Sequence, residues 1–248
     1  QGDWSSDVCS SDLGDAGAIS SVVVMDMNAG DVSVLDLQNF TVNLTSLTST
    51  NAGGTATVTS DNAGGATLEL DTSGGGFSFA GDIDDGAGAV ALTKQGANTL
   101  TLSGSNDYSG ATTVSDGTLE AGSATGFSAN SAVTLSAAGS TLDVNGLSVT
   151  IDSLGGGTGV LDMGADDVTD STLTATNDLT LTGMTVNFGT GGNDTLDAGG
   201  TLTTPAGATS KADGGNLTLR GVTSIVLGNT VSAGGGTLLF DGDGTTLL

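Results

Sequence analysis

The sequence predicts an all-β protein, a single-stranded, right-handed parallel β-helix (solenoid) with almost no helix. Three observations predict this fold. Short stretches of alternating apolar and polar residues recur along the chain, Gly, Asn and Asp separate them, and small side chains dominate the composition. Small aliphatic and hydroxyl side chains suit a narrow interior filled layer by layer, as in a solenoid.

The candidate strands are about three to five residues long and often read Thr-x-Leu or Leu-x-Leu. They are Ser33–Leu37, Thr41–Leu44, Thr55–Thr59, Ala66–Leu70, Thr99–Ser103, Ala132–Leu135, Thr141–Val144, Ser148–Ile151, Thr172–Thr174, Leu179–Leu181, Thr185–Phe188, Leu217–Leu219, Ser224–Leu227 and Thr237–Phe240. No window of about 11 residues combines a 3.6-residue period with helix-capping signals, so we expect almost no helix.

Short strands at this spacing also fit an antiparallel sandwich. The β-helix is favoured because aromatic residues are only 3% of the chain and Asn145-Gly146 is its single Asn-Gly pair. Asp-Gly pairs such as Asp116-Gly117 do occur, and they are compatible with hairpins. At roughly 20–25 residues per turn, about 235 residues would form about ten turns of about three strands each.

The charge balance excludes two classes of partner. The chain carries 28 acidic and 3 basic residues, a net charge of −25. Nucleic acid is excluded because almost no cations are present to neutralise phosphates. Direct membrane insertion is not expected either, because the acidic surface repels anionic lipids and no apolar run is long enough to span a bilayer.

The first 13 residues differ from the rest of the chain. They hold the single Trp and the single Cys (Trp4 and Cys9) and lack the alternation of the later strands. They resemble one reading frame of a sequencing-adapter oligonucleotide, so we interpret residues 1–13 as a non-native scar and residues 14–248 as the β-helix fragment. Without the scar the chain has no cysteine, which leaves no disulfide and no thiolate metal site.

The stretch from Leu92 to Leu119 carries the most specific pattern. It reads L-T-K-Q-G-A-N-T-L-T-L-S-G-S-N-D-Y-S-G-A-T-T-V-S-D-G-T-L. It resembles the autotransporter-associated β-strand repeat, also called the passenger-associated transport repeat. Asn98 stands where that family usually has Gly and Asp107 where it usually has Thr, and both substitutes suit turns or exposed rims. The resemblance is recognisable over about residues 65–165.

The resemblance assigns structural roles to the motif. We expect its Leu and Val residues to point inward, its Gly residues to form corners, Asn106 to stack its amide at a corner, and Tyr108 to cap a turn with its hydroxyl in water. The motif residues are Leu92, Lys94, Gly96, Thr99, Leu100, Leu102, Gly104, Asn106, Tyr108, Gly110, Thr112, Val114, Gly117 and Leu119.

The resemblance also implies a function and a location. An autotransporter passenger is exported through the outer membrane by a β-barrel at the C-terminus of the same polypeptide and lies at the bacterial cell surface. The sequence therefore predicts a non-catalytic extracellular stalk or adhesin-like display module. Its surface ligand is not specified.

Candidate catalytic groups are few. The chain has no His, which removes Ser-His-Asp and Cys-His catalysis and His-ligated zinc. A carbohydrate-active β-helix enzyme with Asp side chains along one groove is the alternative, and carboxylates that converge on one cleft would favour it. The three isolated basic residues, Lys94, Lys211 and Arg220, argue against a polysaccharide lyase.

One segment suggests calcium. Residues 191–200 resemble a single unit of the Ca²⁺-binding nonapeptide repeat, which makes Asp194 and Asp197 weak candidate metal ligands. One unit does not complete such a site. Apart from calcium, no cofactor is expected. A Ca²⁺-stabilised extracellular repeat protein, exported without a barrel of its own, is the third interpretation, and calcium would then raise the melting temperature.

Overall fold

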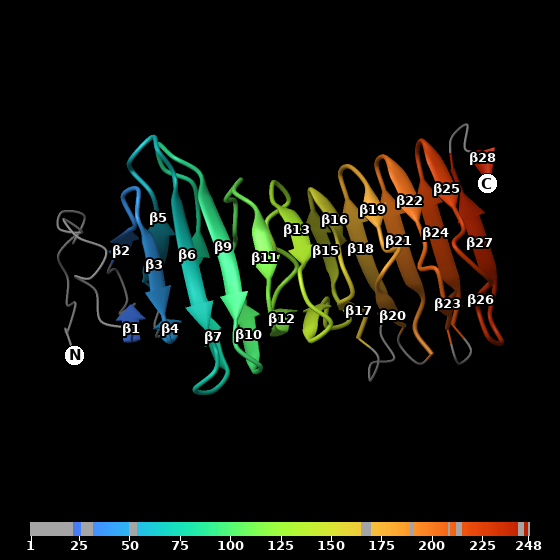
Figure 1. The fold of residues 1–248 in the computed structure, drawn as a ribbon, viewed down its shortest axis with the longest axis horizontal. Helices are drawn as coiled ribbons and strands as arrows, with labels where there is room; N and C mark the ends of the chain where they lie inside the picture. The colour runs from blue at the N-terminus through green and yellow to red at the C-terminus, as the bar shows by residue number, and fades with distance from the viewer. Residues whose placement is uncertain are drawn as a thin grey trace.

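The computed structural model describes residues 22–25, 32–49, 54–164, 170–188, 191–207, 209–211, 215–242 and 246–247. Within these ranges the chain is all-β and contains no helix, and thus none that could cross a membrane. The paired strands lie parallel, and each is hydrogen-bonded to a strand of the preceding turn, of the following turn, or of both. The predicted parallel β-solenoid is confirmed (Figure 1).

Each turn has three faces, and its first face is one continuous ten-stranded sheet. This sheet runs the length of the molecule, so every turn contributes one strand to it. Its strands are β3 (Thr41–Leu44), β6 (Ala66–Asp71), β9 (Val90–Gln95), β11 (Thr112–Val114), β13 (Ala132–Leu135), β16 (Ser153–Gly156), β19 (Leu179–Thr180), β22 (Thr201–Thr203), β25 (Ser224–Val226) and β28 (Thr246–Leu247).

The second face is divided into three shorter sheets. They are β1 (Val22–Met25) with β4 (Ser46–Ser49); β7 (Phe77–Phe79), β10 (Thr99–Leu102), β12 (Gly117–Ala121), β14 (Ser140–Asp143), β17 (Val160–Asp162) and β20 (Thr185–Asn187); and β23 (Thr209–Ser210) with β26 (Val231–Ser232).

The third face is interrupted in the middle of the molecule. Its first sheet holds β2 (Val32–Asp36), β5 (Thr55–Thr59) and β8 (Asp82–Ile83), and its second holds β15 (Ser148–Ile151), β18 (Ser171–Ala175), β21 (Asp194–Ala198), β24 (Leu217–Gly221) and β27 (Leu238–Asp241). Between them the chain crosses this face twice without a strand, at residues 103–111 and 122–131.

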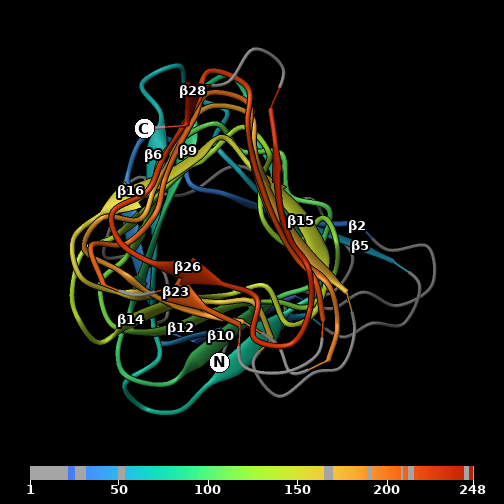
Figure 2. The same cartoon turned by 90° about the vertical axis from the view of Figure 1, so that its right-hand side faces the viewer.

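The chain winds right-handed through about nine turns, close to the predicted ten. Figure 2 shows the solenoid from its C-terminal end, where the cross-section has three sides. Within each turn the chain passes from the first face to the second and then to the third while it comes closer to the viewer. Turn length varies. Along the first face, Leu92 pairs with Thr112 and Val42 pairs with Leu68, so the repeat measured on that face ranges from 20 to 26 residues.

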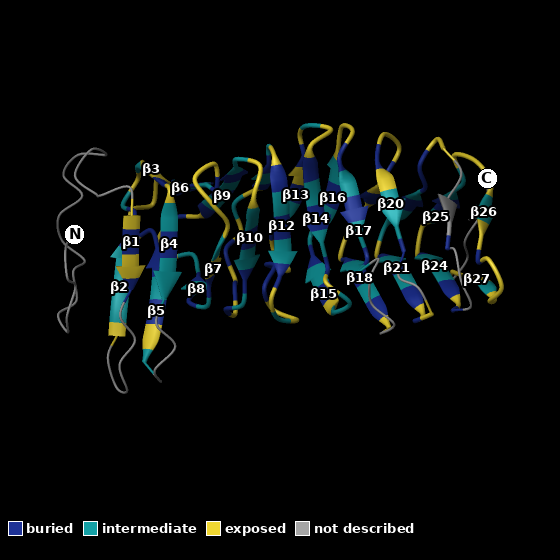
Figure 3. Cartoon of the chain, turned by 90° about the horizontal axis from the view of Figure 1, so that it is seen from below, coloured by how far each residue is buried: buried dark blue, intermediate teal, exposed yellow. Residues whose placement is uncertain are grey.

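The core is a set of columns of like side chains. In β6, β9 and β12 buried positions alternate with half-exposed ones, and the same alternation of dark blue with teal and yellow runs along the molecule (Figure 3). Because the register is parallel, Leu100 stacks on Leu119, and Leu119 on Leu142, all of them buried. Each column buries apolar surface continuously, which is the main stabilising contribution in such a fold.

The strand predictions were mostly correct in place, with errors at the ends. The ranges predicted for β3, β5, β13 and β15 match the structure. Residues 191–200, which resemble a single unit of the calcium-binding repeat, contain strand β21, in which the inward Asp194 and Leu196 alternate with outward residues in a regular ladder. The predicted scar at residues 1–13 lies outside the described residues.

The close packing of successive turns can be tested by substitution of Gly104. A Cβ atom at this position would lie 2.0 Å from the carbonyl oxygen of Gly81 in the preceding turn. Gly104→Ala is therefore expected to lower the free energy of unfolding by about 1–3 kcal/mol, measured by denaturant titration. Gly155→Ala is the matched control, because no atom lies within 4 Å of its added Cβ, and it should be nearly neutral. Equal effects of the two changes would contradict this account of turn packing.

Candidate functional site

The motif residues occupy the turns in which the third face has no strands. Their apolar members Leu92, Leu100, Leu102, Val114 and Leu119 point inward and are buried. Gly117, the first residue of β12, has a φ of +63°, a conformation that favours glycine. The motif thus supplies the core and corners of two turns.

Lys94 is buried at an inward position of β9, where its side chain is 0% exposed. In register it follows Leu70 and precedes Val114, so it replaces an aliphatic residue in a core column. Its ammonium reaches the corner and donates hydrogen bonds to the carbonyl oxygens of Gln95 (3.1 Å), Gly96 (2.7 Å) and Asp116 (2.8 Å). Burial lowers the pKa of Lys94 to about 8. Lys94 therefore joins two turns by capping their carbonyls.

Two neighbours extend this corner. The Thr72 hydroxyl, one turn earlier, donates toward the carbonyl oxygens of Gln95, Gly96 and Asn98 at 2.9–3.1 Å. The Asn98 side chain donates in return to the carbonyl oxygen of Thr72 at 2.7 Å. Asn98 thus acts as a link between turns at the position where the repeat family usually has Gly.

Asn106 bridges three turns across the strandless face. Its Oδ1 accepts a hydrogen bond from the backbone N–H of Ile83 at 2.8 Å, and its Nδ2 donates to the carbonyl oxygen of Gly126 at 2.6 Å. Asn106 is nearly buried. The side chain therefore replaces backbone pairing that a strand would provide here.

Tyr108 corrects the prediction of a solvated hydroxyl. Its side chain is 1% exposed, and its hydroxyl lies 2.8 Å from the Thr112 hydroxyl, which in turn lies 2.8 Å from that of Ser131. Burial raises the pKa of Tyr108 to about 12. The prediction was wrong because buried and exposed positions alternate along residues 104–109, and Tyr108 shares the inward face with Gly104 and Asn106. Ser128, one turn later, donates to the Tyr108 carbonyl oxygen at 2.6 Å.

A family model described as the passenger-associated transport repeat matches residues 92–121. These residues are an autotransporter passenger repeat. The match covers β10, β11 and β12 and most of β9, together with the first strandless crossing of the third face. Lys94, Asn106 and Tyr108, which hold these turns together, all lie within the repeat.

The chain is also similar to a much larger protein. It is 42% identical over 80 residues to "Adhesin BmaC autotransporter" of Brucella suis biovar 1 (strain 1330). The aligned part is 32% of this chain and 2% of the adhesin. No solved structure matches the chain.

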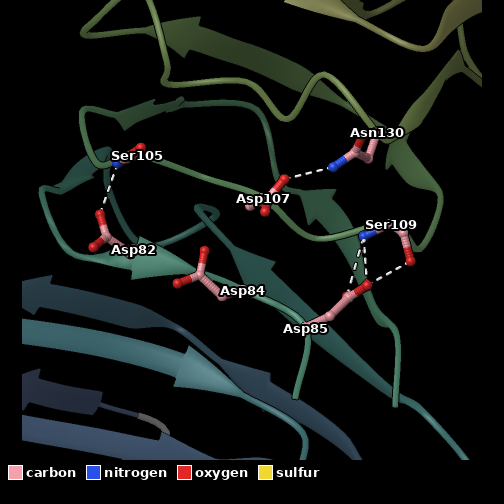
Figure 4. Close-up of a pocket in the computed structure, with 7 residues that line it drawn as sticks. All are labelled: Asp82, Asp84, Asp85, Ser105, Asp107, Ser109 and Asn130. Carbon is pink, nitrogen blue, oxygen red and sulfur yellow. Dashed lines mark hydrogen bonds between the residues drawn. The ribbon is translucent and has the colours of Figure 1, made fainter. Parts of the chain in front are cut away.

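An acidic groove opens where the repeat leaves the third face without strands (Figure 4). It has a volume of about 620 Å³. Its lining residues are Asp82, Asp84, Asp85, Ser105, Asp107, Ser109 and Asn130.

Most carboxylates of the groove are engaged within the protein. Asp82 accepts the backbone N–H of Ser105 at 2.7 Å, Asp85 accepts that of Ser109 at 3.1 Å, and Asp107 accepts a hydrogen bond from the Asn130 amide. In the described part of the chain, no group of three or more metal-ligating side chains converges on one point. The groove carboxylates therefore serve mainly as acceptors that tie one turn to the next.

Asp84 differs from the other groove carboxylates. Its Oδ1 is buried and has no hydrogen-bond partner among the described residues. Burial raises the pKa of Asp84, and the neighbouring charge of Asp82 adds to this effect. Both effects favour the protonated form of Asp84.

The two candidate calcium ligands do not converge. Asp194 is fully buried and its Oδ2 lies 2.8 Å from the Lys211 ammonium. Asp197 lies on the opposite side of the same strand, 3.1 Å from the Arg220 guanidinium. Residues three apart on a strand face opposite ways, so these two carboxylates cannot bind one ion together.

Several of these residues were not predicted from the sequence. The bonds of Thr72, Ser128 and Ser131, and the burial of Lys94 and Lys211, became visible only in the structure. One signal was present for Lys94, because it follows Val90 and Leu92 at two-residue spacing and so shares their inward face.

The stabilising role of Lys94 can be tested by Lys94→Met, which keeps an apolar side chain of similar length and removes the ammonium group. Removal of the buried charge should stabilise the folded protein, because its desolvation cost disappears. The loss of three hydrogen bonds to carbonyl oxygens should outweigh this gain and lower the free energy of unfolding by about 1–3 kcal/mol. Denaturant titration measures the change. Thr93→Met, on the outer face of the same strand, is the control and should change stability little. A Lys94→Met protein as stable as the parent would show that the cap is dispensable.

Asp143 provides a test of pH dependence. It lies in register between Glu120 and Asp162 on the outer face of the second-face sheet, and burial, followed by repulsion from Asp162 and Glu120, raises its pKa to about 6. A carboxyl with a raised folded-state pKa binds its proton more tightly in the folded protein. Stability is therefore expected to rise as the pH falls from about 6 toward the unfolded value of 3.8.

Asp143→Asn keeps the side-chain oxygen that accepts the Asn145 N–H and removes the charge. The variant should be more stable than the parent at pH 7, by roughly 1 kcal/mol after allowance for solvent screening, and equal to it near pH 4. Thermal melts across this pH range measure the difference. Asp178→Asn, which lies outside this column, is the control for loss of one negative charge, and an equal gain there would contradict the role of the column.

Proposed function

We propose that this chain is a non-catalytic segment of an autotransporter passenger that acts as a β-helical stalk or adhesin-like display module at the bacterial surface. The observation that carries this proposal is the repeat at residues 92–121, built into a continuous parallel solenoid. Its polar side chains bond to backbone groups of adjacent turns instead of forming a reactive constellation.

Two further observations support the proposal. The relative with 42% identity over 80 residues is named an autotransporter adhesin. The chain also has no His, and its three cations are all committed to carbonyl or carboxylate partners. Such a chain would reach the outside through an outer-membrane barrel on the same polypeptide, and its acidic, rigid rod would hold an effector surface away from the cell.

The groove supports a second candidate, a carbohydrate-active enzyme. Glycoside hydrolysis uses two carboxyl groups, one of them protonated at neutral pH. Asp84 is the residue that could hold that proton, because burial and Asp82 raise its pKa. The bonds made by Asp82, Asp85 and Asp107 weigh against this function, since each has a structural use already.

Surface display can be measured on intact bacteria. The chain would be expressed between a secretion signal and an autotransporter barrel, and external protease would be added before and after membrane permeabilisation. The proposal expects cleavage on intact cells and no release of reducing sugar from a polysaccharide panel. Protection until permeabilisation contradicts the display role. Sugar release that Asp84→Asn abolishes would instead favour the enzyme.

A further inference from the structure

Lys211 and Asp194 form an ion pair that water does not reach. The ammonium nitrogen lies 2.8 Å from Asp194 Oδ2, and both side chains are 0% exposed. Asp194 occupies an inward column between Ser171 of the preceding turn and Leu217 of the following one. A buried pair of this kind carries a desolvation cost that its mutual attraction often fails to offset.

Both partners are held in place by the backbone. The N–H of Asp194 donates to the Asn216 carbonyl at 2.9 Å, and that of Lys211 donates to the Ser232 carbonyl at 3.0 Å. The Ser171 hydroxyl donates to Asp194 Oδ1, the carboxylate oxygen that does not face Lys211. An amine is thus fixed against one oxygen of a carboxyl group while a hydroxyl polarises the other.

We propose that Lys211 and Asp194 join in an intramolecular amide bond, which forms spontaneously once this turn has folded. The Lys211 ammonium first gives a proton to Asp194 Oδ2, and the neutral amine attacks Cγ. Negative charge develops on Oδ1, where the Ser171 hydroxyl stabilises it. A second proton passes from nitrogen to Oδ2, which leaves as water. One ammonium and one carboxylate therefore give one amide and one water molecule, with no oxidant or cofactor.

Two physical effects favour this step at this place. Fixed contact between amine and carboxyl replaces a bimolecular encounter, which is worth an effective concentration of about 10⁵ M or more in well-oriented cases. The dry surroundings favour loss of water and slow the reverse hydrolysis. The product also removes two buried charges, so the cost of burying them disappears.

The other two cations of the chain lack this arrangement. Lys94 is equally buried, but its ammonium meets amide carbonyls, which an amine does not displace. Arg220 contacts Asp197 and Asp241 at a solvated site, and its guanidinium is not a nucleophile. Among the described residues, Lys211 is the amine that faces a buried carboxyl group.

The bond is tested by the intact mass of the purified, denatured chain. The expected mass is one water molecule below that of the sequence, with a branched peptide joining Lys211 to Asp194 after digestion. The full sequence mass would overturn the proposal, and so would a water loss mapped to a succinimide at an Asp-Gly site such as Asp116-Gly117. The parent chain decides the question even if a variant fails to fold.

Matched variants assign the roles. Lys211→Arg keeps the positive charge without a nucleophilic amine, so the full mass should return, whereas Lys94→Arg should remain one water lighter. Ser171→Ala should lower the linked fraction at early times after refolding. A lighter mass that persists in Lys211→Arg would overturn the assignment, and an unchanged rate in Ser171→Ala would remove Ser171 from the mechanism.

Discussion

The parallel ladder between successive turns is the constraint on which the whole structure depends. The described strands satisfy their backbone hydrogen bonds with strands of neighbouring turns and not with strands of the same turn. In-register pairing then stacks each side chain on its counterpart one turn away. Inside, this gives columns such as Leu100, Leu119 and Leu142. Outside, it places Glu120, Asp143 and Asp162 in a row, so like charges meet unless one holds a proton.

The same constraint explains much of the acidity. Where the ladder breaks at a corner, the N–H groups of the next turn need acceptors, and side-chain oxygens of Asp and Asn provide them. Asp170 accepts from Asn193, Asn193 from Asn216, and Asn216 from Thr237, at 2.8–3.0 Å. Asp178 accepts from Thr201 in the same way. An excess of carboxylates that could suggest metal or substrate binding thus serves to join turns.

The sequence predicts the general fold because strand alternation and turn residues are local signals, as at β5 and β15. It does not reveal which polar residues are buried, since that depends on what lies one turn away. Turn length is not constant, so the partner of a residue cannot be counted off along the chain. Tyr108 was misplaced because its hydroxyl bonds to Thr112, which is linked in turn to Ser131 of the following turn, 19 residues further along the chain. Asp194 was a candidate calcium ligand because residues 191–200 resemble a calcium-binding repeat, whereas its partner Lys211 lies 17 residues later, beyond any local pattern.

The variable turn length has a consequence for how such a chain can change. The strands of the first face stay in register while the repeat ranges from 20 to 26 residues, so the corners absorb the difference. Insertions and deletions at corners alter only a local loop, whereas a single residue added within a strand would turn the inward side chains that follow it in that strand outward. Duplication or loss of an entire turn leaves every remaining column intact. Evolution can therefore adjust the reach of the rod in whole-turn steps and diversify its rim without redesigning its interior.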